Sequence, residues 1–214
     1  MMMNKTFKPT YKGMKVNCKS KYGQGLYSAI LDRIYAQVLN LQSYYSRITI
    51  VRIDLHFPDS FDFGHKLENK LLSQYIKKVK IDLGSSIWNE HKRIVHGWVK
   101  EIGTSEKSHY HLFFGFQTLH RNLGAISGDG HTGMWKLFEH HWVRLTGGSV
   151  HLIKPHFLKR DDKQIFEASF YHLSYLAKIR DKHFGTGESY RRFGFSKLLP
   201  KTKELTVLES LMVA

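Results

Sequence analysis

Apolar residues recur every three or four positions in four stretches of the chain and alternate with polar residues in several others. The first spacing predicts helices with one apolar face, and alternation predicts strands with two different faces. Runs of β-branched and aromatic residues bounded by glycine or proline support the strands. The predicted helices cover residues 26–45, 67–79, 134–145 and 166–179, and the predicted strands cover residues 47–57, 91–102, 109–116 and 150–153.

The order of these elements predicts the fold. Without the first and last helices it reads strand, helix, strand, strand, helix, strand, which is the ferredoxin-like or split βαβ pattern. We therefore expect an α+β fold with an antiparallel sheet, helices mainly on one face and the other face open. A chain of 214 residues suits one such domain. We place it at residues 26–199, after a flexible basic arm at residues 1–25 and before a tail at residues 200–214.

The chain is strongly basic, with a formal net charge of +15. A soluble domain with this charge usually binds a polyanion, and nucleic acid is favoured over an anionic membrane or a charge that only confers solubility. Cys18 is the only cysteine, which excludes a disulfide framework and favours the cytoplasm. No apolar run approaches the length of a membrane span, and the N-terminus lacks the apolar core of a signal peptide.

His109 and His111 open an apolar run and are expected on one face of the same strand. Two imidazoles placed in this way can converge on one ion, and their nitrogens suit divalent transition ions. The short polar stretch 103–108 predicts a hairpin, whose antiparallel pairing would bring Glu101 close to His109. The sequence therefore predicts a carboxylate and two imidazoles in one small volume. The alternative is that both histidines are ordinary polar residues at the exposed start of a strand.

The predicted strand at residues 47–57 also has a polar face. Arg52, Asp54 and His56 alternate with apolar residues in its second half. Three ionisable groups on one face of a long strand indicate either a functional face or an open, solvated one.

Tyr175 and Lys178 are three residues apart in a predicted helix and would share a face with Tyr171. A phenol is a weak nucleophile near neutral pH because its pKa is about 10. It becomes useful when a metal polarises the electrophile and a cation stabilises the charge that develops. A metal site, a tyrosine and a lysine are therefore compatible with phosphodiester transesterification. The alternative is that both tyrosines are core residues of an amphipathic helix.

The histidine pair on a strand and the later Tyr-x-x-Lys on a helix together resemble the HUH endonuclease superfamily. In rolling-circle replication initiators the histidines precede the tyrosine in the sequence, as they do here. More narrowly, the chain resembles the inovirus-type replication initiator family, also known as the YagK/YfjJ family of phage and prophage proteins, from about residue 45 to 198. The similar segments are VRIDL at 51–55, HYH at 109–111, SYLAK at 174–178 and RFGFS at 192–196.

This resemblance implies a divalent ion, Mg²⁺ or Mn²⁺, held by His109, His111 and a third polar ligand. In similar proteins that ligand is often a glutamate on the neighbouring strand, which matches Glu101. Asp54, His56 and Glu106 are also candidates for the third ligand. The candidate DNA-binding residues are Arg52, Arg191, Arg192 and Lys197.

The implied activity is that of a single-stranded DNA endonuclease and ligase that initiates rolling-circle replication, with the nuclease domain at residues 26–199. Tyr175 would attack a scissile phosphate, leaving a 5′-phosphotyrosyl link and a free 3′-OH, and Lys178 would stabilise the charge. Tyr171 is the candidate for a second tyrosine. The chain shows no Walker A motif, so a separate host helicase would unwind the replication origin for a polymerase.

Two further functions compete with this interpretation. A non-catalytic DNA-binding regulator of phage or prophage origin would keep the basic surface without needing the metal face. A primase or other nucleotidyl transferase would need paired carboxylates on one strand, whereas the segment from Arg52 to His56 offers only Asp54.

Overall fold

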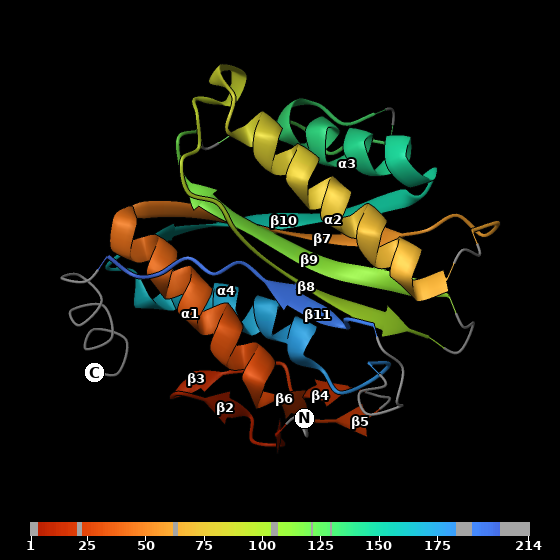
Figure 1. Cartoon of the computed structure of the whole chain (residues 1–214). Coiled ribbons are helices and arrows are strands. Elements are labelled where there is room, and N and C mark those ends of the chain that lie inside the picture. Colours follow the sequence, from red (N-terminus) through yellow and green to blue (C-terminus); the bar gives the residue numbers. More distant parts are fainter. Residues whose placement is uncertain are drawn as a thin grey trace.

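A five-stranded antiparallel sheet forms the centre of the protein within the residues that the structure, a computed structural model, describes (Figure 1). Those residues are 4–20, 23–61, 64–103, 107–120, 122–128, 130–182 and 190–201. The strands lie in the spatial order β10-β7-β9-β8-β11, which confirms the α+β class and the antiparallel sheet. They are β7 (Arg47–His56), β8 (Val95–Ile102), β9 (Ser108–Gln117), β10 (Ser149–Lys159) and β11 (Phe193–Phe195).

Helices cover both faces of this sheet, which corrects the expectation of helices mainly on one face. α2 (Gly64–Leu83) and α3 (Gly133–Thr146) lie on one face, and the 3₁₀ turn η1 (Ser86–Trp88) follows α2. α1 (Ser28–Tyr44) and α4 (Lys163–Leu173) lie on the other face (Figure 1). The face expected to be open is thus partly covered by the first and last helices, which stand outside the βαββαβ order.

The alternation along β7 explains why there is a hydrophobic core on each side of the sheet. Ile48 and Ile50 pack with α1 and α4, whereas Val51 and Ile53 pack with α2 and α3. Complete burial of side chains of this size stabilises the fold by about 1.5–3 kcal/mol each. On the α1 side the row of Ile48 and Ile50 continues with the polar Arg52, so the apolar core gives way there to a polar site.

The N-terminal segment, residues 4–20 and 23–27, is packed against the domain, which corrects the expected flexible arm. Met14 and Cys18 are at most 5% exposed and belong to the core of α1 and α4. The backbone N–H of Asn17 donates to Oγ of Ser174 at 2.8 Å. The short strands of the N-terminal segment pair in antiparallel fashion. The pairs are β1 (Lys5–Thr6) with β6 (Leu26–Tyr27), β2 (Thr10–Tyr11) with β3 (Met14–Lys15), and β4 (Lys19–Ser20) with β5 (Gly23–Gln24).

The helix predicted over residues 166–179 ends earlier than expected. α4 stops at Leu173 and the 3₁₀ turn η2 (Ser174–Ala177) follows it. Lys178 then adopts an extended conformation, with φ −54° and ψ 137°, and bridges to Leu26. Lys178 therefore lies outside any helix, which corrects the expectation that it continues the helix of the candidate nucleophile.

β10 is much longer than the short strand predicted at residues 150–153. It continues through Pro155, where the register against β7 shifts between Ile153 and His156. Proline lacks a backbone N–H and is tolerated at an edge strand with such an irregularity, and β10 is an edge of the sheet.

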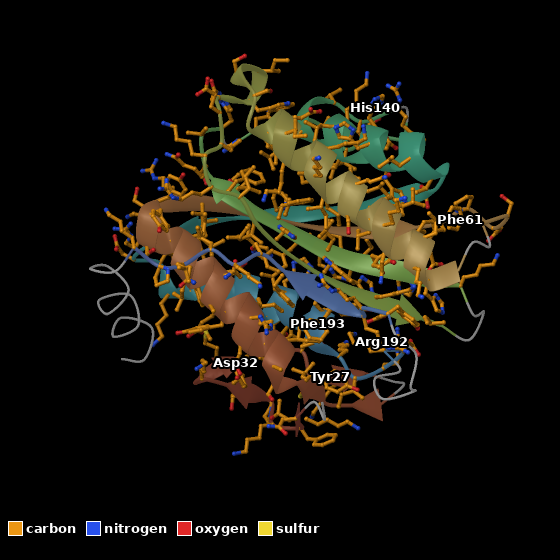
Figure 2. The ribbon with its side chains drawn as sticks, in the orientation of Figure 1. Tyr27, Asp32, Phe61, His140, Arg192 and Phe193 are labelled. Atoms are coloured by element: carbon orange, nitrogen blue, oxygen red, sulfur yellow. The ribbon has the colours of Figure 1, made fainter. Side chains whose placement is uncertain are left out.

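Side chains fill the space between the sheet and the helices on both faces (Figure 2). In the described part of the chain, no helix combines the length and apolar character that a membrane crossing requires. The glycine-containing stretch 183–189 and residues 202–214 of the predicted tail lie outside the described residues.

Candidate metal centre

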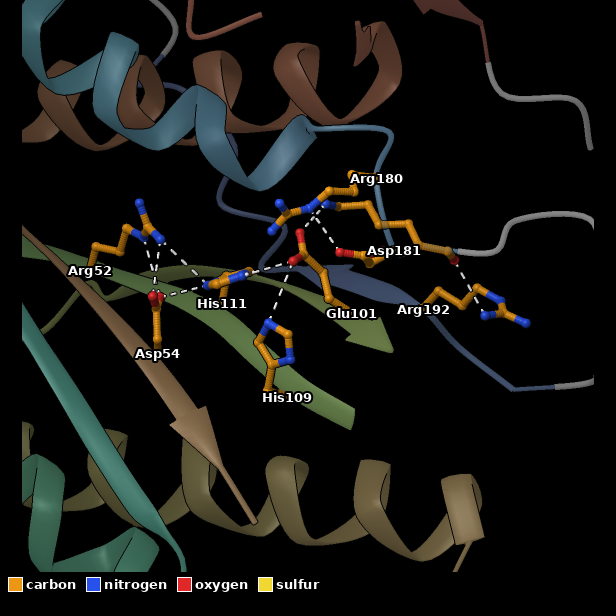
Figure 3. A network of polar contacts seen from close by, with 9 residues as sticks. Arg52, Asp54, Glu101, His109, His111, Arg180, Asp181 and Arg192 are labelled. Atoms are coloured by element: carbon orange, nitrogen blue, oxygen red, sulfur yellow. Dashed lines mark hydrogen bonds and ion pairs between the residues drawn. The ribbon is translucent and has the colours of Figure 1, made fainter. Parts of the chain in front are cut away.

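Glu101, His109 and His111 converge near the β8–β9 turn. Glu101 on β8 pairs directly with His109 on β9, as the hairpin predicts. Oε2 of Glu101 lies 3.5 Å from Nε2 of His109 and 3.1 Å from Nε2 of His111 (Figure 3). One potential ligand atom of each residue lies within 4.8 Å of the other two. The predicted grouping of one carboxylate and two imidazoles is confirmed, and we call these three residues the triad.

The carboxylate of Glu101 is buried, with 1% of the residue exposed. Nζ of Lys182 donates to its Oε1 at 2.5 Å, whereas both histidines face Oε2. Burial alone would raise the pKa of Glu101, but hydrogen bonds with the two histidines and the charge of Lys182 hold it well below its usual range. Glu101 is therefore ionised, and its two oxygens have separate partners.

His111 lies between two carboxylates. Its Nδ1 is 2.7 Å from Oδ1 of Asp54, the residue that pairs with it on β7, and its Nε2 faces Glu101. Burial would lower the pKa of His111, but the two carboxylates outweigh burial and raise it. A histidine that binds a metal usually donates its other ring N–H to a carboxylate or carbonyl, which fixes the orientation of the ring. Asp54 is placed to orient His111 rather than to act as the third ligand.

Arg52 extends this row of charges. Its Nη2 lies 3.0 Å from Oδ2 of Asp54 and its Nε lies 3.3 Å from Oδ1 (Figure 3). Because Arg52 is only 8% exposed, the predicted DNA-binding residue lies inside the site rather than on an open surface. Two parallel contacts of this kind fix both the guanidinium and the carboxylate.

Tyr175 of η2 lies directly beside the triad. Its ring centroid is 5.0 Å from that of His111, with the two rings edge to face. Cζ of Arg52 lies 4.2 Å and Nζ of Lys178 lies 4.5 Å from the centroid of the phenol ring. Burial, followed by the negative charge of Glu101, raises the pKa of Tyr175. The neighbouring cations therefore do not bring the pKa of the phenol below its ordinary value.

The two candidate tyrosines have different environments. Tyr171 lies on α4 and is 45% exposed, whereas Tyr175 is half-buried against Arg52 and His111. The hydroxyl of Ser174 donates to the carbonyl oxygen of Tyr171 at 2.6 Å, where α4 gives way to η2. The structure therefore brings Tyr175, and not Tyr171, against the triad.

The remaining predicted DNA-binding residues divide into two kinds. Arg191 and Lys197 are exposed, whereas Arg192 is 7% exposed. Nη1 of Arg192 donates to the carbonyl oxygen of Lys182 at 3.3 Å. Arg192 thus supports the segment that carries Lys182 instead of facing solvent.

His56, a further candidate for the third ligand, lies beside the triad and not within it. Its ring stacks on that of His109, with centroids 5.2 Å apart and an interplanar angle of 10°. Glu106, the remaining candidate, lies outside the described residues. Glu101 is therefore the candidate that the structure groups with the two histidines.

Lys182 is a residue of this site that sequence reasoning missed. It is fully buried in the structure and ion-paired with Glu101. In the sequence it is one lysine among many in a basic chain, and it follows the candidate nucleophile without a recognisable spacing. Only the three-dimensional contact with Glu101 distinguishes it.

The chain is similar to known proteins over the residues that form this site. The family model described as YagK/YfjJ C-terminal domain matches residues 6–196, a range that contains every residue of the site. A protein of Escherichia coli (strain K12) described as "Uncharacterized protein YagK" is 30% identical over 189 residues, with 74% of this chain and 87% of that protein covered. No solved structure matches the chain.

Proposed function

The chain belongs to the YagK/YfjJ C-terminal domain family, and we propose that it is a metal-dependent, HUH-type endonuclease and ligase for single-stranded DNA. The proposal is carried by one observation, the contact of the Tyr175 ring with the ring of His111 at 5.0 Å between centroids. A tyrosine held against a pair of imidazoles and a carboxylate has the groups that metal-assisted transesterification needs. The biological role that we propose is initiation of rolling-circle replication.

The arrangement of the sheet supports a ferredoxin-like, HUH-type fold as part of this proposal. α2 connects β7 to β8, and the antiparallel β9 lies between these two strands. α3 connects β9 to β10 in the same way, with β7 between them. Two crossovers that each enclose one antiparallel strand are typical of the split βαβ pattern.

The triad fits a divalent cation. It offers two imidazole nitrogens and one carboxylate oxygen, ligands that suit a divalent transition ion, and Mn²⁺ or Mg²⁺ is the ion that we propose. Lys182 occupies Oε1 of Glu101, so Oε2 is the oxygen available to an ion. Three protein ligands leave positions for substrate oxygens, and a bound ion would polarise the scissile phosphate.

We assign the role of nucleophile to Tyr175. Its oxygen forms a bond to phosphorus while the bond from phosphorus to the 3′ oxygen breaks, which gives a 5′-phosphotyrosyl link and a 3′-OH. The phenol releases one proton and the 3′ oxygen takes one up, so the step is balanced. The negative charge of Glu101 opposes ionisation of the phenol, and the positive charge of Arg52 favours it. A cation bound next to Glu101 would offset the charge of that carboxylate and so assist the attack.

The proposed partners follow from what the chain offers. The exposed Arg191 and Lys197, together with the lysines of the N-terminal segment, are available for phosphates of a single strand. The reverse reaction, attack of a 3′-OH on the phosphotyrosyl link, would join DNA ends. A host helicase and a polymerase would open and copy the origin.

The test is a nicking assay with single-stranded DNA from the source replicon, with and without Mn²⁺, followed by mass spectrometry of the protein. The wild-type protein and Tyr171→Phe should form a covalent adduct only with the ion, and Tyr175→Phe should form none. An adduct on Tyr171 alone would contradict the assignment of the nucleophile. DNA binding without cleavage under every metal condition would favour the non-catalytic regulator.

A further inference from the structure

A depression of about 630 Å³ lies where β7 ends and β10 begins. This volume is within the range of sites for small ligands, about 300–1,000 Å³. Its lining includes His56, Phe57 and the small residues Gly147, Gly148 and Ser149. The lining also includes the ion pair of Asp59 and Lys107, so the cavity combines aromatic and charged groups.

One residue belongs to both this cavity and the triad. Nε2 of His109 lies 3.5 Å from Glu101, and His109 is also a lining residue of the cavity. The ring of His56 stacks nearly parallel on the ring of His109, with centroids 5.2 Å apart. A phosphate held at the triad would therefore have the cavity beside it.

The walls of the cavity are fixed by contacts of their own. Nε1 of Trp142 donates to the carbonyl oxygen of His56 at 2.9 Å and holds the end of β7. A Cβ atom at Gly148 would lie 2.0 Å from that same oxygen, so only glycine allows this close approach. Gly147 has a φ of +70°, a conformation that other residues rarely adopt. The backbone packing at His56, Gly147 and Gly148 therefore determines the shape of the cavity.

We propose that this cavity binds the base of the nucleotide next to the phosphate at the triad. The inference rests on the proposed function, because that function brings a single strand to the triad. A base in a single strand is free to turn away from its neighbours, and bases stack well on aromatic side chains, including histidine. The cavity is next to the phosphate site, has an aromatic wall and is large enough for a base.

The experiment measures DNA binding in the Tyr175→Phe background, which removes the proposed nucleophile. Fluorescence anisotropy with Mn²⁺ would compare a labelled dT 12-mer with an abasic strand of the same length. Ser149→Trp, which fills the cavity from a position paired with His56, and His56→Ala, which removes the aromatic wall, are the variants. Each should weaken dT binding about 5- to 150-fold, the contribution of one stacked base, and Ser149→Trp, which does not touch the triad, should leave abasic binding unchanged.

His140→Ala is the matched control, because His140 is an exposed histidine on α3 and not in the cavity wall (Figure 2). Equal affinities of wild type and both variants for dT would overturn the inference. Displacement of the 12-mer by free deoxynucleoside monophosphates at comparable concentration would also overturn it, since the cavity would then select a free nucleotide.

The nicking assay distinguishes this inference from the proposed function. Base-dependent binding that both variants lose, without any nicking by the wild-type protein, would support the cavity and contradict the function. Metal-dependent nicking with no difference between dT and abasic strands would support the function and overturn the inference.

Discussion

Nδ1 of His111 lies 2.7 Å from Oδ1 of Asp54, and the two residues come from neighbouring strands of the sheet. Asp54 accepts the ring N–H on the side away from the triad, so it orients Nε2 toward Glu101. The Arg52 guanidinium in turn holds Asp54 and packs on Tyr175. One row of polar contacts therefore connects the candidate ion site with the candidate nucleophile.

Substitution of Asp54 should weaken metal binding. We expect Asp54→Asn to lower Mn²⁺ affinity about 10- to 100-fold, the usual effect of losing such a hydrogen-bond partner. Isothermal titration calorimetry would measure it. Asp82→Asn is a matched control, because Asp82 also lies 2.7 Å from a histidine nitrogen, in His141, far from the triad in the α2–α3 layer. Unchanged Mn²⁺ affinity in Asp54→Asn would contradict the orienting role.

Removal of Lys182 should leave a buried carboxylate without its partner. Lys182→Met is expected to reduce the free energy of unfolding by about 3–5 kcal/mol, as for other broken buried ion pairs. The double variant Lys182→Met with Glu101→Gln should recover a large part of this loss, because no unpaired charge remains. Urea unfolding measures both variants and Glu101→Gln alone. Strictly additive losses would show that Lys182 and Glu101 are not coupled.

Salt dependence should identify the surface that binds single-stranded DNA. The exposed lysines of the N-terminal segment lie on the α1 side of the sheet, which also carries the triad. Replacing four of them by alanine should reduce the slope of log affinity against log salt by up to about 3, since each contact contributes about 0.7. The four lysines to replace are Lys5, Lys8, Lys15 and Lys19.

The control for this experiment is the same number of exposed lysines on α2, which lies on the opposite face of the sheet. Substituting them should leave the slope unchanged. A larger effect from α2 than from the N-terminal segment would place the DNA on the wrong face for the triad. The control residues are Lys66, Lys70, Lys77 and Lys78.

The protein should lose stability as the pH falls from 6.5 toward 4. Burial, and then the charge of Lys80, lowers the pKa of His96 from 6.5 to about 4. In this range the unfolded chain binds a proton that the folded chain excludes, so the stabilisation present above pH 6.5 is progressively lost. Between pH 7 and pH 5 His96 should account for about 1–2 kcal/mol.

His96→Phe should therefore flatten the pH dependence of the unfolding free energy over this range. The substitution keeps a ring against Phe114 and removes the titrating group. Urea unfolding at pH 7 and pH 5 is the measurement, with exposed His140→Phe as the control that should retain the wild-type slope. Identical slopes for His96→Phe and the wild type would contradict the prediction.

The sequence predicts the part of the site that local pairing determines. Glu101 and His109 face each other because a short turn fixes the register of one hairpin. The contact between Asp54 and His111 could not be predicted from the sequence, because it depends on which strands become neighbours in the sheet. Lys182 was not predictable, since a buried lysine has no sequence pattern that separates it from a surface lysine.

The errors in the predicted fold have a common physical origin. Apolar periodicity reports that a helix has a buried face, but not which side of the sheet receives it, so the positions of α1 and α4 were missed. In the same way, the lysines of the N-terminal segment suggested a free arm although Met14 and Cys18 anchor it in the core. The apolar periodicity also predicted a helix that continues past Ser174 to Tyr175 and Lys178. In the structure α4 ends just before Ser174, which contacts the distant residue Asn17.

The triad residues lie close together along the chain, whereas Tyr175 lies far from them, and this difference has a consequence for folding. Glu101 and His111 are ten residues apart within one hairpin, and such local contacts form early because little chain has to be closed into a loop. Tyr175 follows α3, β10 and α4 in the chain, so its contact with the triad closes a much longer loop. Under the proposed function, a chain folded only as far as this hairpin would hold the ion before it has the nucleophile, and attachment to DNA would be confined to molecules that have completed folding.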